Sequence, residues 1–384
     1  MKNFFLFIFS AVIFSAGAAE LIVDYSKKNK EAYSDFKSAL AKAKNGDTIK
    51  IIKVDFPIQD AIVIKNRSDI TVDGMYNTFT GTERISSNEW KMISPGIWKR
   101  DIRVPAGIAL RYFMVIDGKI NRMGRFFKAK CSTPYRKVEE LKEKEWTIVV
   151  NKNSEIKRTK LYSIYLKLDT SISNISQADV SEPRLKQTSG VEISGKCKNL
   201  SIKNIICRNF WNDGFNIHNT SVNTVFDTVC ALDCGDDGIS AHENSQISVR
   251  NFVSIGNSTG ICHIQQVTAS HTNCYIADAL GKDIFFKSTK NNLLNNRLKN
   301  VFVKCSSAGG VSLGAAPQDK LNIEKLTVVL ASRSAAFYLI PDKNAEVSTA
   351  SIAILNSEPQ KMVEFRKSLF ARFNGEIEKN LASR

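Results

Sequence analysis

The chain has 384 residues, 43% of them hydrophobic and 9% aromatic, which is enough for one large solenoid or two ordinary domains. Lysine and arginine outnumber aspartate and glutamate by 54 to 38, and the formal net charge is +16. This charge favours an anionic partner, although a basic surface kept for solubility is the alternative. The sequence has no basic helix, RNP-like strand or zinc-ligand pattern, so we expect no nucleic-acid partner.

The first 19 residues predict a cleaved signal peptide. Lys2 gives a positive start, an apolar run follows from Phe4 to Phe14, and small residues then precede a cut after Ala18 or Ala19. The run is too short to span a membrane, and no later stretch qualifies. We therefore expect a secreted or periplasmic monomer whose anionic partner is an acidic polysaccharide or a membrane surface.

The next segments predict the capped start of a solenoid. Residues 31–44 place apolar side chains on one helical face, and Asn45-Gly46 ends that helix. Strands are predicted at 47–51, 60–64 and 69–74. Because the first coil of a solenoid exposes open strand edges, the helix is expected to cover it.

The residue pattern changes between about residues 75 and 165. Trp90, Trp98 and Trp146 lie here, and the strand-like run 112–116 is followed by Asp117-Gly118, which predicts a hairpin. We interpret this region as a β-rich segment inserted into the solenoid. At the other end, the helical spacing of 360–384 predicts a cap on the last coil.

From about residue 190 the sequence repeats. Aligning Gly214, Gly238, Gly260 and Asp283 gives steps of 24, 22 and 23 residues, each with a short apolar-alternating strand. A repeat of this period predicts a solenoid, here a single-domain, all-β, parallel β-helix over residues 20–384.

The chain contains eight cysteines, and export permits disulfides. Cys207 and Cys230 lie 23 residues apart, which places them in one column of the repeat. Cysteine in such a column behaves as a small apolar residue, so we expect mostly free, buried thiols.

The capping helix, the Asp73-Gly74 turn and the coils after 190 resemble the right-handed parallel β-helix of the pectate-lyase-like superfamily. Within it, residues 212–287 are most similar to the polygalacturonase family of glycoside hydrolases, whose motifs are Asn-Thr-Asp, Gly-Asp-Asp, Gly-His-Gly and Arg-Ile-Lys. Asn212-Asp213, Gly235-Asp236-Asp237 and Lys287 match three of them. Thr259 stands where the family has histidine, and Phe285 where it has arginine.

Three aspartates form the candidate catalytic group. Asp213 and Asp237 share a column on one external face, where neighbouring strands lie about 4.8 Å apart, and a turn can bring Asp236 to the same side. Carboxylates this close cannot all ionise freely, so one is expected to hold a proton near neutral pH. The resemblance implies that Asp236 is the acid and that Asp213 and Asp237 activate water. The alternative is turn chemistry, since aspartate commonly precedes glycine.

Further polar residues are expected to bind the substrate. Alternation places His218, His242 and Lys287 in one outer column that suits acidic sugar groups; a solvated polar stack is the alternative. Trp211 is predicted to stack on a sugar ring or to pack in the core. Thr259 joins the substrate-binding group, whereas His263 is expected to point inward.

We therefore predict an exported glycoside hydrolase that cleaves a uronic or sulfated polysaccharide without a cofactor or metal. A β-helix lyase is the alternative enzyme, with Lys287 as base and a calcium ion on the carboxylates. A non-catalytic glycan-binding β-helix is the alternative from another class.

Overall fold

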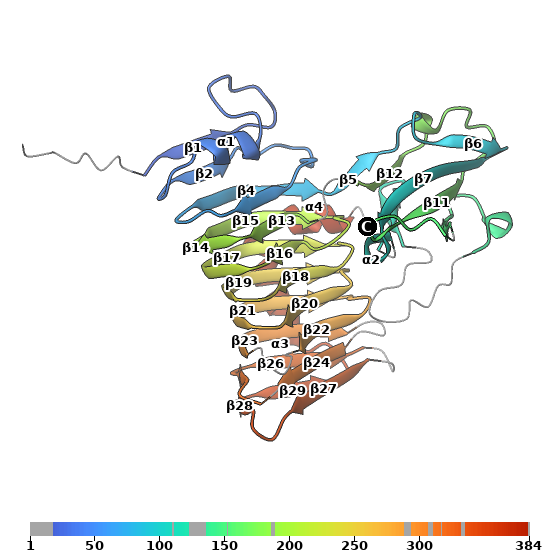
Figure 1. Ribbon diagram of the computed structural model, residues 1–384. Coiled ribbons are helices and arrows are strands. Elements are labelled where there is room, and N and C mark those ends of the chain that lie inside the picture. The colour runs from blue at the N-terminus through green and yellow to red at the C-terminus, as the bar shows by residue number, and fades with distance from the viewer. Residues whose placement is uncertain are drawn as a thin grey trace, which may run out of the picture.

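The chain folds as a parallel β-solenoid of about 12 turns, with 53% of residues in strands and 11% in helices, which confirms the predicted fold (Figure 1). The computed structural model describes residues 18–109, 111–122, 136–151, 153–185, 189–287, 293–305, 310–315, 317–331 and 335–382. Most of the predicted signal peptide lies outside these residues. No helix in the described ranges is long and apolar enough to cross a membrane.

The larger solenoid sheet has 13 strands, and its pairings between successive turns are parallel. Its strands are β1 (Glu20–Val23), β2 (Thr48–Ile51), β4 (Thr71–Thr80), β14 (Lys196–Lys198), β15 (Ser201–Arg208), β17 (Thr220–Leu232), β19 (Ser245–Ile255), β21 (Val267–Ala277), β23 (Leu294–Cys305), β25 (Lys320–Ile323), β26 (Leu326–Leu330), β28 (Glu346–Thr349) and β29 (Ile352–Leu355).

The second solenoid sheet has eight strands, each stacked on its equivalent in the next turn. They are β3 (Ile62–Lys65), β13 (Val191–Ser194), β16 (Phe215–Ile217), β18 (Asp237–Ala241), β20 (Thr259–Ile264), β22 (Lys282–Lys287), β24 (Gly310–Ala315) and β27 (Ala336–Pro341). Phe215 pairs with Ile239 and Ile261 with Ile284, which confirms the register predicted from the glycines. Side chains from both sheets fill the interior with one continuous apolar core.

The predicted N-terminal cap is present but shorter than expected. Helix α1 (Phe36–Lys42) begins at Asp35, whose side chain accepts a hydrogen bond from the Ser38 amide at 2.7 Å. Phe36, Ala39 and Leu40 are buried against the core. The helix starts later than residue 31 because aspartate at the N-cap satisfies an amide that would otherwise lack a partner.

A β-rich excursion leaves the solenoid after β4 and returns before β13 (Figure 1). It comprises β5 (Thr82–Arg84), β6 (Lys91–Ser94), β7 (Ile97–Pro105), α2 (Ala106–Ala109), β8 (Met114–Ile116), β9 (Lys119–Asn121), η1 (Val138–Glu140), β10 (Trp146–Val150), β11 (Thr159–Lys167), η2 (Ile175–Gln177) and β12 (Val180–Pro183). The predicted hairpin is confirmed, because β8 pairs with β9 across Asp117-Gly118. The excursion extends beyond the expected limit at 165.

The C-terminal helices correct one prediction. Helices α3 (Gln360–Ala371) and α4 (Glu376–Ala382) lie along the flank of the larger sheet rather than over the last coil. Their apolar residues pack on strands β15 to β26, and Asn380 donates to Thr78 Oγ1 at 3.0 Å, close to the N-terminal end. Outward-facing apolar residues such as Val253 and Phe302 provide this second surface, which the inward-facing pattern of the repeat did not reveal.

The seven cysteines that the structure describes are free and buried, as predicted; Cys131 lies outside the described residues. The prediction that Cys207 and Cys230 share one column was wrong, because Cys207 pairs with Ala231 and Cys230 pairs with Ile206. Cys207 therefore faces the interior and Cys230 the C-terminal helices. The local step is 24 residues, and a shift of one residue reverses the face of a strand.

Candidate active site

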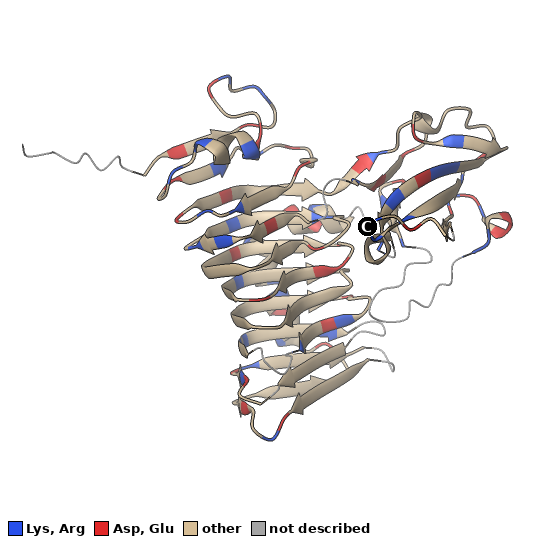
Figure 2. Cartoon of the chain, in the orientation of Figure 1, with Lys and Arg blue, Asp and Glu red and all other residues tan. Residues whose placement is uncertain are grey.

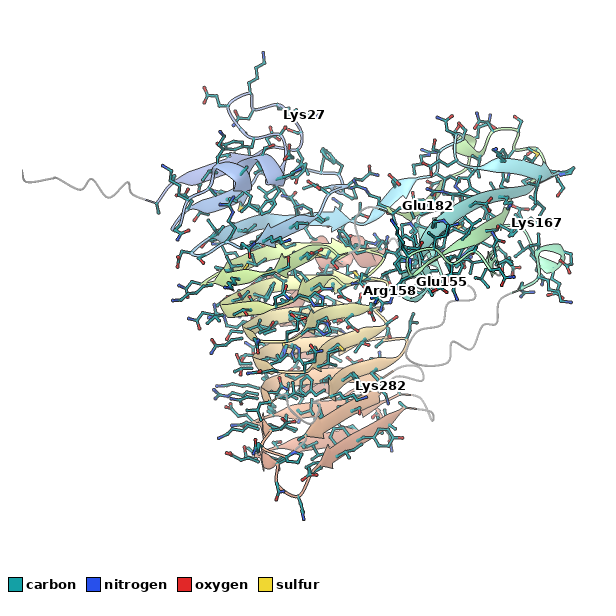
Figure 3. All side chains as sticks on the ribbon, in the orientation of Figure 1. Lys27, Glu155, Arg158, Lys167, Glu182 and Lys282 are labelled. Atoms are coloured by element: carbon teal, nitrogen blue, oxygen red, sulfur yellow. The ribbon has the colours of Figure 1, made fainter. Side chains whose placement is uncertain are left out.

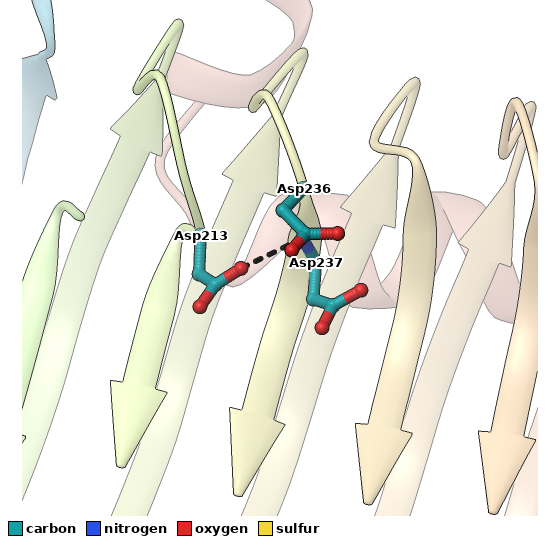
Figure 4. A group of neighbouring side chains, drawn as sticks. All are labelled: Asp213, Asp236 and Asp237. Carbon is teal, nitrogen blue, oxygen red and sulfur yellow. Dashed lines mark hydrogen bonds between the residues drawn. The ribbon is translucent and has the colours of Figure 1, made fainter. Parts of the chain in front are cut away.

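The three predicted aspartates meet at the start of β18. One carboxylate oxygen from each of Asp213, Asp236 and Asp237 lies within 4.8 Å of the other two (Figure 4). Asp213 lies just before β16, whereas Asp236 and Asp237 enter β18, one solenoid turn later. The clustering predicted from the motif spacing is confirmed.

Backbone contact between the two turns holds the group together. The Gly235 amide donates to Phe210 O at 2.6 Å and the Asp236 amide donates to Asn212 O at 2.8 Å. A Cβ at position 235 would lie 1.7 Å from Trp211 O, so only glycine allows this approach. The glycine of Gly235-Asp236-Asp237 is therefore a steric requirement for placing Asp236 beside Asp213.

Asp213 accepts several hydrogen bonds. The Asp237 amide donates to Oδ1 at 2.9 Å, and the side chains of Asn212 and Asn216 both donate to Oδ2. Hydrogen bonds to a carboxylate favour its charged form. Asp213 is therefore suited to act as a base, and Asn216, which we did not predict, helps to hold it.

The aspartates are more enclosed than expected. We predicted an external face, but Asp213, Asp236 and Asp237 are only 2%, 5% and 2% exposed. The excursion reaches this face: Arg111 Nη2 lies 2.7 Å from Asp236 Oδ2, and Nη1 bonds to Asn212 Oδ1. Arg111 lies 101 residues before Asn212 in the chain, and no local motif marks it.

Trp211 belongs to the core, which corrects its prediction as a sugar platform. The side chain is fully buried in the apolar cluster of the excursion. Its Nε1 donates to Ile108 O at 2.6 Å, and its ring makes an edge contact with Tyr112 at a centroid distance of 5.6 Å. Trp211 therefore anchors the excursion directly beside Asn212 and Asp213.

A buried polar network lies inside the excursion, beside Trp211. Glu182 on β12 accepts hydrogen bonds from Trp90 Nε1 and the Tyr112 hydroxyl and pairs with Arg100. Figure 3 labels Glu182 where the excursion meets the solenoid. Burial is the main factor that raises the pKa of Tyr112, and the adjacent Glu182 carboxylate raises it further. The phenol therefore stays a donor to Glu182, next to Arg111.

The predicted outer column is present. The rings of His218 and His242 stack at a centroid distance of 4.6 Å with 7° between their planes, and Ser240 Oγ lies 2.7 Å from His242 Nε2. Ile264 follows in the next turn and pairs with the exposed Lys287. The two histidines are half-buried, and one apolar residue separates them from the lysine.

Two further predicted positions are enclosed. Thr259 pairs with Asp237 but is fully buried, and within the described chain its Oγ1 forms no hydrogen bond. It therefore does not offer the open substrate contact we expected. His263 points inward, as predicted, with Nε2 at 2.8 Å from Nε2 of His271, a residue to which we had assigned no role.

Three buried titratable residues, His263, His271 and Asp283, lie outside the aspartate group. Burial lowers the pKa of His271 to about 3 and holds that of His263 well below its ordinary value. Asp283 aligns with the glycine column but points inward, where burial raises its pKa to about 7 against the opposing effect of hydrogen bonding with Cys305. The two histidines are therefore neutral near pH 7, whereas Asp283 titrates there.

The lyase alternative would place a calcium ion on the three carboxylates, each of which offers one ligand atom. Calcium takes six to eight oxygen ligands, typically including several carboxylates. In this structure the guanidinium of Arg111 already supplies a cation beside Asp236. Arg111 would therefore have to release Asp236 before a calcium ion could use all three carboxylates.

Comparison of the chain with protein-family models and with curated proteins finds no match. The fold and the site geometry define the chain as a parallel β-solenoid with an enclosed group of three aspartates, contacted by an arginine from an inserted β-rich segment.

Proposed function

We propose that the protein is a glycoside hydrolase that cleaves an anionic, uronic or sulfated polysaccharide. The observation that carries this proposal is the convergence of Asp213, Asp236 and Asp237 from two turns of the solenoid. Glycoside hydrolysis needs one protonated carboxylic acid and one ionised carboxylate on either side of the scissile bond. The polygalacturonase-like motifs support the same assignment.

In the proposed reaction Asp236 donates a proton to the leaving oxygen, and Asp213 with Asp237 activates the attacking water. The hydrogen bonds that favour ionised Asp213 support its role as base. The excess of Lys and Arg in the excursion supports an anionic substrate, because these side chains lie on the segment that reaches the aspartates (Figure 2). Export through the predicted signal peptide would bring the protein to polysaccharide outside the cytoplasm.

A panel of uronic and sulfated glycans tests the proposal. We expect new reducing ends without the absorbance of unsaturated uronates. That absorbance would instead identify a lyase, and binding without cleavage would leave a glycan-binding protein. The anomer formed first, observed by NMR, distinguishes inversion from retention.

Replacing the proposed acid gives the sharper test. We expect Asp236→Asn to lower turnover by about 10²–10⁴-fold, the usual contribution of general acid catalysis. Asp227→Asn is the matched control, since Asp227 lies on the larger sheet and pairs with Arg250 at 3.1 Å. Full turnover by the Asp236 variant would exclude Asp236 as the acid.

A further inference from the structure

The contact between Arg111 and Asp236 joins two separate parts of the fold. Arg111 follows α2 of the excursion, whereas Asp236 enters β18 of the solenoid. Their side chains are 18% and 7% exposed, and the guanidinium also bonds to Asn212. This ion pair therefore lies at the mouth of the aspartate group, with little surrounding water to weaken it.

This contact is incompatible with the chemistry of a general acid. A guanidinium stays protonated at any working pH, so it favours the ionised form of the carboxylate that it touches. A general acid must also come within about 2.6–3.2 Å of the oxygen that it protonates. At 2.7 Å, Arg111 Nη2 occupies that position on Asp236 Oδ2. Because Asp236 Oδ1 is buried, Arg111 must leave Oδ2 before a sugar oxygen can reach Asp236.

We propose that Arg111 is a specificity-determining residue that makes cleavage depend on an acidic group of the substrate. This inference rests on the proposed hydrolase function. A carboxylate or sulfate group on the incoming sugar pairs with the guanidinium and draws it from Asp236. Asp236 then takes up a proton, favoured by its ionised neighbours Asp213 and Asp237. A neutral glycan offers the guanidinium no competing anion, so Asp236 stays paired with Arg111.

The protons balance over one turnover. Asp236 gives its proton to the leaving glycosidic oxygen as the bond to the anomeric carbon breaks. The attacking water forms the new bond to that carbon and loses a proton to Asp213 or Asp237. That proton then passes to solvent and balances the one that Asp236 took up from solvent when Arg111 moved away, so Asp236 is ionised again at the end of the turnover. Arg111 transfers no proton and returns to Asp236 when the acidic product leaves.

Hydrogen bonds hold the backbone on either side of Arg111, whereas its long side chain can rotate. The carbonyl oxygen of Ile108 accepts a hydrogen bond from Trp211 Nε1 at 2.6 Å, and the Tyr112 hydroxyl donates one to the buried Glu182. The exchange therefore requires rotation of one side chain and leaves the excursion in place. Arginine suits it because the guanidinium forms paired hydrogen bonds with carboxylate or sulfate as readily as with aspartate.

Binding of small probes tests the inference independently of turnover. We expect Asp236→Asn to bind D-glucuronate about tenfold more tightly than the wild type, because Arg111 loses its competing carboxylate. The double variant Asp236→Asn/Arg111→Gln should lose this gain, and neither change should alter the affinity for D-glucose. Arg103→Gln is the matched control, because Arg103 lies on β7 and donates to Ser154 O. Equal D-glucuronate affinities of the single and double variants would overturn the inference.

Turnover provides the second measurement. On a glycan that the panel shows to be cleaved, we expect Arg111→Gln to lower the preference for the acidic polymer over its carboxyl-reduced form by about tenfold or more. Arg111→Lys keeps the positive charge but loses the paired N–H donors of the guanidinium. Its preference for the acidic polymer should lie between those of the wild type and Arg111→Gln. Circular dichroism and Tm check that each variant folds. An unchanged preference in Arg111→Gln would overturn the inference and leave hydrolysis standing. Absent cleavage with Arg111-dependent glucuronate binding would reject hydrolysis and retain Arg111 as the anion-binding residue.

Discussion

At the scale of single residues, neighbouring turns of the solenoid bring matching side chains together. Asp213, Asp236 and Asp237 cluster, and His218 stacks on His242. Trp211 had two interpretations in the sequence, and only the surrounding cluster decided for the core. Arg111 could not be predicted, because its partner lies on a segment more than a hundred residues away.

The interior pair His263–His271 makes stability depend on pH. His271 has a pKa of about 3 in the folded chain against 6.5 in the unfolded one, so the unfolded state binds an extra proton between these values. The free energy of unfolding should therefore fall as the pH drops from 6.5 towards 3, by up to about 1.4 kcal/mol per pH unit.

We expect His271→Gln to flatten this acid slope, measured by urea unfolding across the acid range. His218→Gln is the matched control on the half-buried outer pair. An identical slope in wild type and His271→Gln would contradict the assignment.

At the scale of elements, the long strands of the larger sheet bend at a column of residues in the left-handed region. Asn251, Asn273 and Asn300 have φ of 54°, 57° and 55°. The side-chain amides of Asn273 and Asn300 each donate to the asparagine one turn earlier, whereas that of Asn251 donates to Asp227. Thr228 occupies the preceding position with φ of 56°. A β-branched residue is strained there, whereas asparagine tolerates this conformation.

Thr228→Asn should therefore stabilise the protein by about 1 kcal/mol, or about 2 °C in Tm for a chain of this size. Differential scanning calorimetry measures the change. Thr272→Asn, beside Asn273 in an extended part of its strand, provides the control and should give no gain. A Tm for Thr228→Asn at or below that of the wild type would show that the strain is absent or offset.

At the scale of the whole molecule, the C-terminal helices link the ends of the solenoid. Met362, Leu369, Phe370 and Phe373 are buried on the flank of the larger sheet. Lys53 pairs with Glu376 at 3.2 Å near the N-terminal end. The same segment thus covers apolar surface over several turns, which a cap on the last coil would leave exposed.

Removing residues 360–384 should expose this surface, lower Tm and increase the binding of a hydrophobic dye such as ANS. Glu376→Gln is the control: it removes one partly exposed ion pair and should change stability by no more than about 1 kcal/mol. A truncated chain with wild-type Tm and no added dye binding would show that the helices are dispensable.

Residue patterns were sufficient to predict the parallel solenoid, its register from Gly214 to Asp283, the capping helix and the clustering of the aspartates. These features follow from side-chain alternation and a repeat period, which are local and recur in every turn. The folded chain was needed to show that the aspartates are enclosed and that Trp211 joins the excursion to the solenoid. It also placed Arg111 on Asp236 and the C-terminal helices on a flank. Those contacts join segments far apart in the chain, and their partners follow no period that a single sequence displays.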